Sequence, residues 1–245
     1  MKLIKDVFAR IWALWTLVIF LITMIIFIIP ILLFCLTVPD PLATNRFIAI
    51  ARTWMGIFLP LIGCPLRING RNNFQQGQQY VVICNHNALM DVPVSYPSIP
   101  GGNKTIAKAE MAKIPVFGII YKLGSVLVDR KNEQSRKESF QKMKKVLNSG
   151  LHMCIYPEGT RNKTNEPLKG FHDGAFKLSI DTGKAIIPGV IFNTRIVNPA
   201  NKFFYLMPHR LRIDFLAPIA PLPGDTVESL KTRCWQTMEA AIRRG

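Results

Sequence analysis

The chain is poor in acidic side chains and in cysteine. Its 245 residues carry 15 acidic against 31 basic side chains, which gives a formal net charge of +16 at pH 7. Such an excess of positive charge predicts anionic partners, namely nucleic acid, anionic lipid headgroups or phosphorylated small molecules. The five cysteines include no C-x-x-C pair, and three lie in apolar runs. This usage predicts free thiols, no disulfides and a reducing compartment.

Several motifs of well-known enzyme classes are also absent. The sequence has no G-x-S-x-G, so it lacks the nucleophile turn of the α/β-hydrolase type. No His/Cys cluster has zinc spacing, and neither G-x-x-x-x-G-K-[ST] nor G-x-G-x-x-G occurs. We therefore expect no bound metal and no cofactor. The length fits one domain with an attached element.

A long apolar run does stand near the N-terminus. Residues 11–38 are 28 residues without a charge. As a straight helix they would measure ~42 Å, more than the ~30 Å hydrocarbon core of a bilayer. The run is too long for a signal peptide, and no small-x-small cleavage site follows it. We expect Pro30 to kink or end this helix, and we expect a second, interfacial helix over 41–61, where Arg46 and Arg52 interrupt an apolar pattern.

Basic residues flank the apolar run on both sides, so a single crossing would leave one basic set outside, against the positive-inside tendency. A hairpin that dips into one leaflet keeps both sets on the cytoplasmic side. A true span stays open as the alternative, but we favour the hairpin. The predicted organisation is membrane-anchoring helices over 1–62 and a second domain over 63–245.

The remainder alternates between short apolar runs and helical patterns. Strands are predicted over 80–84, 125–129, 152–156, 185–192 and 210–216. Helices are predicted over 133–149, with Asn132 as N-cap, and over 227–244. Such alternation predicts an α/β fold with a mostly parallel sheet flanked by helices, whose active-site loops gather at strand ends. We expect Pro188-Gly189 to form a turn there.

A histidine leaves the first of these strands. His86 is followed five residues later by Asp91. An aspartate that holds one imidazole nitrogen lets the other take a proton from a hydroxyl, which is the arrangement of a general base. The alternative is a surface histidine at a turn, because His-x4-Asp also occurs by chance. Polar groups at neighbouring strand ends favour the catalytic interpretation.

Three further segments overlap predicted strands: Gly124–Arg130, Ile155–Arg161 and Ala185–Val190. Together with Asn85–Asp91 they resemble, in order and spacing, the four sequence blocks of the glycerolipid acyltransferases, and most closely the 1-acylglycerol-3-phosphate acyltransferases. The resemblance runs from about residue 67 to residue 215.

This resemblance implies roles for individual residues. His86 would deprotonate the glycerol hydroxyl that attacks a thioester, and Asp91 would orient it. The residues implied in binding the acceptor and its phosphate are Arg130, Glu158, Gly159, Thr160, Arg161 and Lys108. The glycine could also bring a backbone amide close to the oxyanion. For the segments around residues 130 and 158 the alternative is a solvated turn.

The implied function is transfer of an acyl group from acyl-CoA or acyl-carrier protein to the 2-hydroxyl of 1-acylglycerol 3-phosphate, giving phosphatidate. Its partners would be lysophosphatidate, the acyl thioester and membrane lipids, with no nucleic acid. The catalytic domain would face the cytoplasm, at the inner membrane in a bacterium. One alternative keeps the chemistry with another acceptor: glycerol 3-phosphate, another lysophospholipid or a lyso-aminolipid. A second alternative is a non-catalytic, basic membrane-binding protein.

Overall fold

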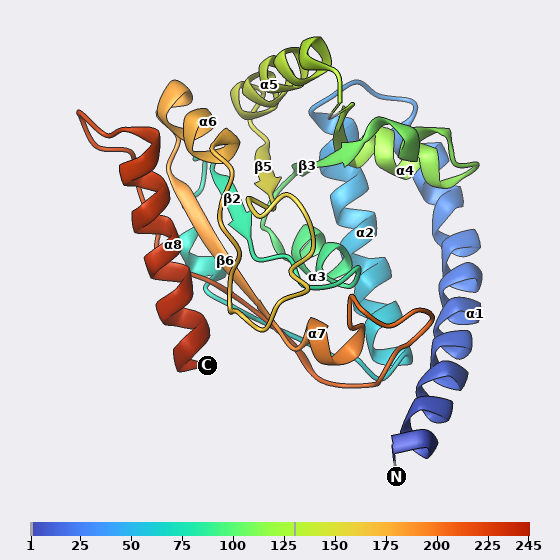
Figure 1. Cartoon of the computed structure of the whole chain (residues 1–245). Helices are drawn as coiled ribbons and strands as arrows, with labels where there is room; N and C mark the ends of the chain where they lie inside the picture. The colour runs from blue at the N-terminus through green and yellow to red at the C-terminus, as the bar shows by residue number, and fades with distance from the viewer. Residues whose placement is uncertain (1, 130) are drawn as a thin grey trace.

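The computed structural model describes residues 2–129 and 131–245. In this part of the chain seven strands form one sheet, in the order β1-β7-β6-β2-β5-β3-β4 (Figure 1). The strands are β1 (Leu66–Asn69), β2 (Val81–Cys84), β3 (Asn103–Lys108), β4 (Ser125–Val128), β5 (His152–Ile155), β6 (Ile186–Phe192) and β7 (Leu211–Phe215). All neighbours pair in parallel except β6 and β7. The predicted α/β fold with a mostly parallel sheet is confirmed.

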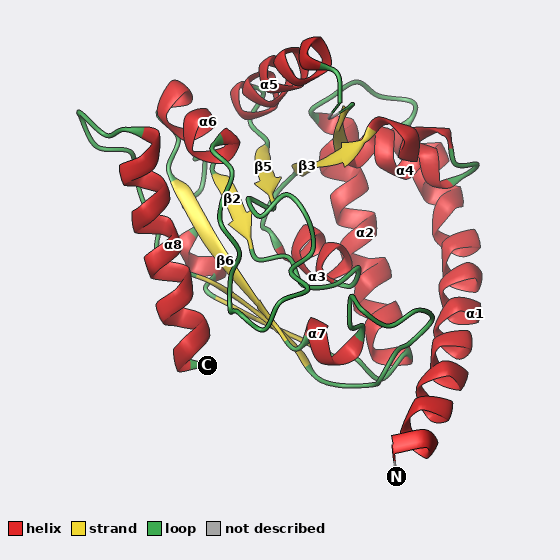
Figure 2. Ribbon diagram, viewed as in Figure 1, coloured by secondary structure: helices red, strands yellow, loops and turns green. Residues whose placement is uncertain are grey.

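Helices cover the sheet (Figure 2). They are α1 (Lys2–Cys35), α2 (Leu42–Leu61), α3 (Asp91–Ser98), α4 (Phe117–Gly124), α5 (Glu133–Asn148), α6 (Gly174–Thr182), α7 (Thr194–Val197) and α8 (Val227–Arg244), with short 3₁₀ turns at Arg71–Asn73 and Ala109–Lys113. The Asn132 side chain caps α5 by accepting the Ser135 amide, as expected from the sequence.

The central strand β2 shows how the sheet is held between two helical layers. Successive side chains of a strand point to opposite faces. Val81 and Ile83 belong to a buried cluster that includes apolar residues of α5, α6 and α8. Val82 and Cys84 belong to a second cluster, with apolar residues of α2 and α3. Because both faces are covered, β2 is apolar throughout, and its C-terminal end is fixed rigidly in the middle of the sheet.

The strand β3 was missed by the sequence analysis because it contains two lysines. Lys104 is buried, yet its ammonium lies 2.6 Å from the Asp40 carboxylate in the turn between α1 and α2. A paired charge can occupy a position where a lone charge would be too costly. The pairing therefore joins the sheet to the N-terminal helices, and only the three-dimensional structure reveals it.

The prediction of a turn at Pro188-Gly189 is wrong, because both residues lie inside β6. They pair there with Ile83 and Cys84 of β2. Proline has no amide hydrogen to donate to a neighbouring strand. It is tolerated here because the pairing of β6 with β7 begins only at Gly189. A Cβ atom on Gly189 would lie 2.9 Å from the Cys84 sulfur, so the glycine permits close packing of the two strands.

The N-terminal helices form an antiparallel pair. Their packing includes a hydrogen bond of 2.9 Å from the Trp54 indole to Thr23 and stacking of Phe20 on Trp54. Pro30 does not end α1, since the helix continues to Cys35. A kink at the proline, the other expectation, stays a prediction. The turn after the proline is held by packing, because Ile31 and Cys35 are buried in a cluster with residues of α2.

The two helices of this pair differ in their exposure. Residues Leu3–Cys35 form one helix long and apolar enough to cross a membrane, and much of its apolar surface is exposed. Helix α2 instead places Trp54, Phe58 and Leu59 in the same cluster as β2. The division into domains at residue 62 stays a prediction, but α2 clearly contributes to the core of the α/β part.

Candidate active site

The centre of the site is the loop that joins β2 to α3. His86 stands two residues beyond the end of β2, and Asp91 is the first residue of α3. The His86 Nδ1 lies 2.8 Å from an Asp91 carboxylate oxygen. The His86 side chain is partly exposed, whereas the Asp91 side chain is completely buried. The sequence thus correctly indicated that these two side chains meet.

Asp91 is fixed by the backbone of its own loop. The oxygen that contacts His86 also accepts hydrogen bonds from the amides of Asn87, at 2.5 Å, and Ala88, at 2.7 Å. An ionised carboxylate can only accept, so the proton shared with the imidazole lies on Nδ1. The Nε2 atom of His86 is then left as the acceptor, which is the tautomer that a general base requires.

The segment after β5 holds the peptide of His86 from both sides. The His86 amide donates to Glu158 Oε1 at 2.7 Å, and the His86 carbonyl accepts the Asn162 amide at 2.6 Å. The other Glu158 oxygen accepts the Lys169 amide at 3.1 Å. Glu158 is buried, and burial raises its pKa, an effect opposed by these two amide bonds. In this structure Glu158 positions the histidine loop; its contact with the acceptor glycerol stays a prediction.

An aromatic ring lies against the imidazole. The ring of Tyr156 stacks on His86 with centroids 4.4 Å apart, and the Tyr156 hydroxyl is 2.7 Å from the Ser95 hydroxyl on α3. The sequence analysis gave Tyr156 no role at the site. Ser95 lies one helical turn beyond Asp91. Its contact with the Tyr156 hydroxyl holds the tyrosine ring against one face of the His86 imidazole, which restricts the movement of the imidazole.

Gly159 and Thr160 form the turn that follows Glu158. Gly159 has φ of +69°, and a Cβ atom there would lie 2.7 Å from the ring of His172, so only glycine fits without strain. Its amide already donates to the Tyr156 carbonyl at 3.0 Å. This bond argues against the Gly159 amide as the oxyanion donor. The Thr160 hydroxyl accepts a hydrogen bond of 2.7 Å from the Lys169 ammonium.

Basic side chains lie around this edge of the sheet. Arg161 is half-buried and directly precedes Asn162, while Lys108 is exposed at the C-terminal end of β3. Arg130, also expected at the site, lies outside the described residues. The sequence analysis missed Lys169 and Arg195. The Arg195 guanidinium donates to the Asn87 side chain at 2.9 Å, next to His86. Neither follows a motif, so only the fold reveals them.

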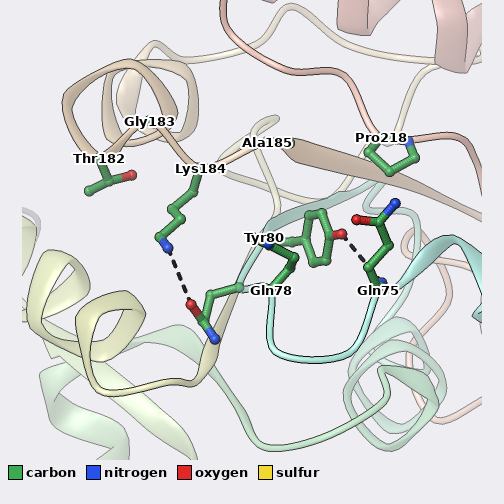
Figure 3. A pocket seen from close by; sticks show the side chains of 9 residues that line it. Gln75, Gln78, Tyr80, Thr182, Gly183, Lys184, Ala185 and Pro218 are labelled. Atoms are coloured by element: carbon green, nitrogen blue, oxygen red, sulfur yellow. Dashed lines mark hydrogen bonds between the residues drawn. The ribbon is translucent and has the colours of Figure 1, made fainter.

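One cavity lies away from His86 and Asp91. It has a volume of about 290 Å³ and is lined by polar groups that include Gln75, Gln79 and Lys184 (Figure 3). Tyr80 and Ala185 in its wall precede β2 and β6, so this cavity lies at the amino ends of the strands. His86 lies at their carboxyl ends, where ligands of parallel sheets bind. The cavity is therefore separate from the His86–Asp91 pair.

Comparison with known proteins identifies the family. Residues 65–192 match the family model described as Acyltransferase. The chain is 31% identical to a 1-acyl-sn-glycerol-3-phosphate acyltransferase of Haemophilus influenzae, over 80% of this chain and 81% of that protein. It is 32% identical to an enzyme of the same name from Cocos nucifera, over 65% of this chain and 51% of the relative.

A third relative of that name, from Borreliella burgdorferi, is 29% identical, over 62% of this chain and 59% of its own length. The chain thus spans just over half of the Cocos and Borreliella proteins. The fold is similar to the crystal structure of the 1-acyl-sn-glycerophosphate acyltransferase PlsC from Thermotoga maritima, with a TM-score of 0.81, 18% identity, and coverage of 100% of this chain and 97% of that one. The match of the family model over more than half of the sequence shows that this chain belongs to the acyltransferase family.

Proposed function

We propose that this protein transfers an acyl group from a thioester to the 2-hydroxyl of 1-acylglycerol 3-phosphate at a membrane, forming phosphatidate. The single observation that carries the proposal is the contact of 2.8 Å between His86 Nδ1 and the buried Asp91, at the carboxyl end of the central strand. The names of the curated relatives support the choice of acceptor.

The chemistry follows from the tautomer of His86. Its Nε2 takes the proton of the acceptor hydroxyl while that oxygen attacks the thioester carbonyl. The tetrahedral intermediate then collapses, the carbon–sulfur bond breaks, and the thiolate leaves with the proton returned by the imidazolium. The buried Asp91 stabilises the imidazolium in the interval. Since the imidazole acts only as a base, no acyl-enzyme forms, and this step contributes about 10²–10⁴-fold to the rate.

Recognition of the acceptor phosphate is assigned in this proposal to Arg161, with Arg130 and Lys108 as further candidates. The planar guanidinium of arginine presents a fork of donors that suits a phosphate monoester. Arg161 directly precedes Asn162, whose amide donates to the carbonyl of His86. A phosphate bound by Arg161 would consequently lie within reach of a glycerol whose hydroxyl meets His86. Thr160 and Glu158 complete the proposed acceptor site.

The proposal places the α/β part on the cytosolic side, where either acyl-CoA or acyl-carrier protein would supply the acyl group. The antiparallel arrangement of α1 and α2 supports a hairpin. The Trp12 indole near the start of α1 donates to the Ile62 carbonyl just beyond the end of α2, at 3.0 Å. Both ends of the pair therefore lie together, as a hairpin entering and leaving one leaflet requires.

An acceptor panel tests this function. The purified protein in lipid vesicles would be given acyl-CoA or acyl-carrier protein, and thiol release would be followed with each acceptor. We expect release with lysophosphatidate, and little with glycerol 3-phosphate, other lysophospholipids or lyso-aminolipids. Preference for one of those compounds would change the acceptor but keep the mechanism. Absence of release with every acceptor and both donors would favour the non-catalytic, membrane-binding alternative.

A further inference from the structure

The loop between α7 and β7 exposes two aromatic side chains. Phe203 is 89% exposed and Phe204 41% exposed. Phe204 also has φ of +46°, an unfavourable conformation for a residue with a bulky side chain. Exposing aromatic rings to water and holding a bulky residue at positive φ both raise the free energy of the folded chain. This pairing of exposure and strain points to a partner for the loop.

The loop is attached to the first turns of α1. Lys202 forms an ion pair of 2.8 Å with Asp6, and the Arg10 guanidinium donates to the Phe203 carbonyl at 3.3 Å. The Leu206 amide donates to the Ala9 carbonyl at 3.2 Å. Figure 1 shows the same contact, with the loop lying beside the N-terminal part of α1. The loop and the start of this helix are therefore one surface.

The apolar and charged side chains of this shared surface indicate the kind of partner that it contacts. The same first turns of α1 also expose apolar side chains, including Leu3, Val7 and Phe8. Arg10 adds positive charge beside the backbone of Phe203, whereas the charge of Lys202 is balanced by Asp6. Aromatic rings with basic neighbours are typical of protein segments at the boundary between lipid headgroups and acyl chains. The charged first turns of α1 also suit that depth, because the long uncharged run begins only at residue 11.

From these contacts we infer that residues 199–207, which we call the aromatic loop, form a second membrane anchor, with Phe203 and Phe204 in the interfacial layer of the bilayer. The inference rests on the proposed membrane association of α1. The Met207 amide donates to the Val197 carbonyl of α7 at 2.9 Å, and Arg195 of α7 contacts Asn87. Anchoring the loop would hold the His86 edge of the sheet close to the lipid surface.

The test uses the full chain with an environment-sensitive fluorophore on one introduced cysteine, Phe203→Cys. The five native cysteines are buried and should react little with the label in the folded protein. Leu222→Cys is the matched control, since Leu222 is also an exposed apolar residue on a loop, and Ile25→Cys reports on α1 itself. Protein-free vesicles of phosphatidylcholine and phosphatidylglycerol serve as the probe, with nitroxides either near the headgroup or deep in the chain.

We expect the label at 203 to shift to the blue on addition of vesicles and to be quenched more by the shallow nitroxide, with no change at 222. A shift at 25 without one at 203 would overturn the aromatic-loop anchor while leaving the membrane association of α1 intact; a loop that docks on another protein would give this result. Stronger quenching at 203 by the deep nitroxide would also contradict an interfacial position. No shift at either site would refute both proposals.

Discussion

At the scale of single residues, the proposed catalysis depends on a histidine whose ring proton is positioned by neighbouring groups. Asp91 is buried and receives two amide bonds on the same oxygen that contacts His86. Tyr156 and Glu158 then restrict the ring and the peptide of the histidine. Preorganisation of this kind lowers the cost of reaching the reactive arrangement, because the groups do not need to reorganise during the reaction.

Asp91→Asn tests the orientation of His86. The asparagine amide can donate to Nδ1, which would place the imidazole proton on Nε2 and remove the basic atom from the reaction. We expect kcat to fall by about 10²–10⁴-fold, with little change in the KM for either substrate. Steady-state kinetics on protein with an unchanged circular dichroism spectrum would measure this. A kcat close to that of the wild type would show that the carboxylate is not needed.

Arg161→Lys tests recognition of the phosphate. Lysine keeps the positive charge but loses the two parallel donors of the guanidinium. The KM for lysophosphatidate should rise about tenfold, the equivalent of ~1.4 kcal/mol of lost binding, while the KM for the acyl thioester stays near its wild-type value. Equal changes in the two constants, or no change, would argue against contact between Arg161 and the phosphate.

At the scale of elements, the ends of five of the seven strands in the described part of the chain could be predicted from the sequence, whereas β1 and β3 were not predicted. The runs at 80–84, 125–129, 152–156, 185–192 and 210–216 agree with observed strands within a residue at each end. The strand β3 could not be predicted, because Lys104 becomes acceptable only when Asp40 approaches from a distant turn. The contacts of Arg195 and Tyr156 with the site were hidden for the same reason. Short motifs locate the chemistry, whereas long-range neighbours appear only in the fold.

The strand β5 carries a buried histidine that should make stability depend on pH. His152 accepts the Tyr80 amide on Nδ1 at 3.1 Å, and burial lowers its pKa to about 4. In the unfolded chain its pKa returns to about 6.5. Unfolding therefore takes up a proton between these values, so the stabilisation is complete above pH 6.5 and is lost as the pH falls toward 4. The total is about 3 kcal/mol.

His152→Gln removes this titration, because glutamine can accept the same amide but does not ionise. Denaturant unfolding measured from pH 7 to pH 4 should show a smaller loss of stability in the variant than in the wild type. Parallel loss in both proteins would mean that another group causes the acid sensitivity.

At the scale of the whole molecule, the two N-terminal helices that form the proposed membrane anchor differ in what they contact. Helix α1 exposes apolar surface, while α2 contributes Trp54, Phe58 and Leu59 to the core. Removal of residues 1–61 would expose that core, so a truncated chain cannot separate anchoring from folding. The topology has to be tested in the complete protein.

We expect the N-terminal end and the α/β part to lie on the same, cytoplasmic, side of the membrane. Single cysteines at the exposed positions Leu3 and Lys137 can be labelled with an impermeant thiol reagent in sealed vesicles of known orientation. The hairpin predicts labelling of both from the same face. Labelling from opposite faces would establish a true span through the bilayer.

In the proposed mechanism His86 is the general base of lysophosphatidate acylation. The most direct measurement is thiol release from the acyl thioester, dependent on lysophosphatidate, by the wild type, His86→Ala and the matched control His209→Ala, whose histidine is exposed on another loop. We expect kcat to fall by about 10²–10⁴-fold in His86→Ala and to stay near the wild-type value in His209→Ala. Wild-type turnover by a folded, membrane-bound His86→Ala variant would contradict it.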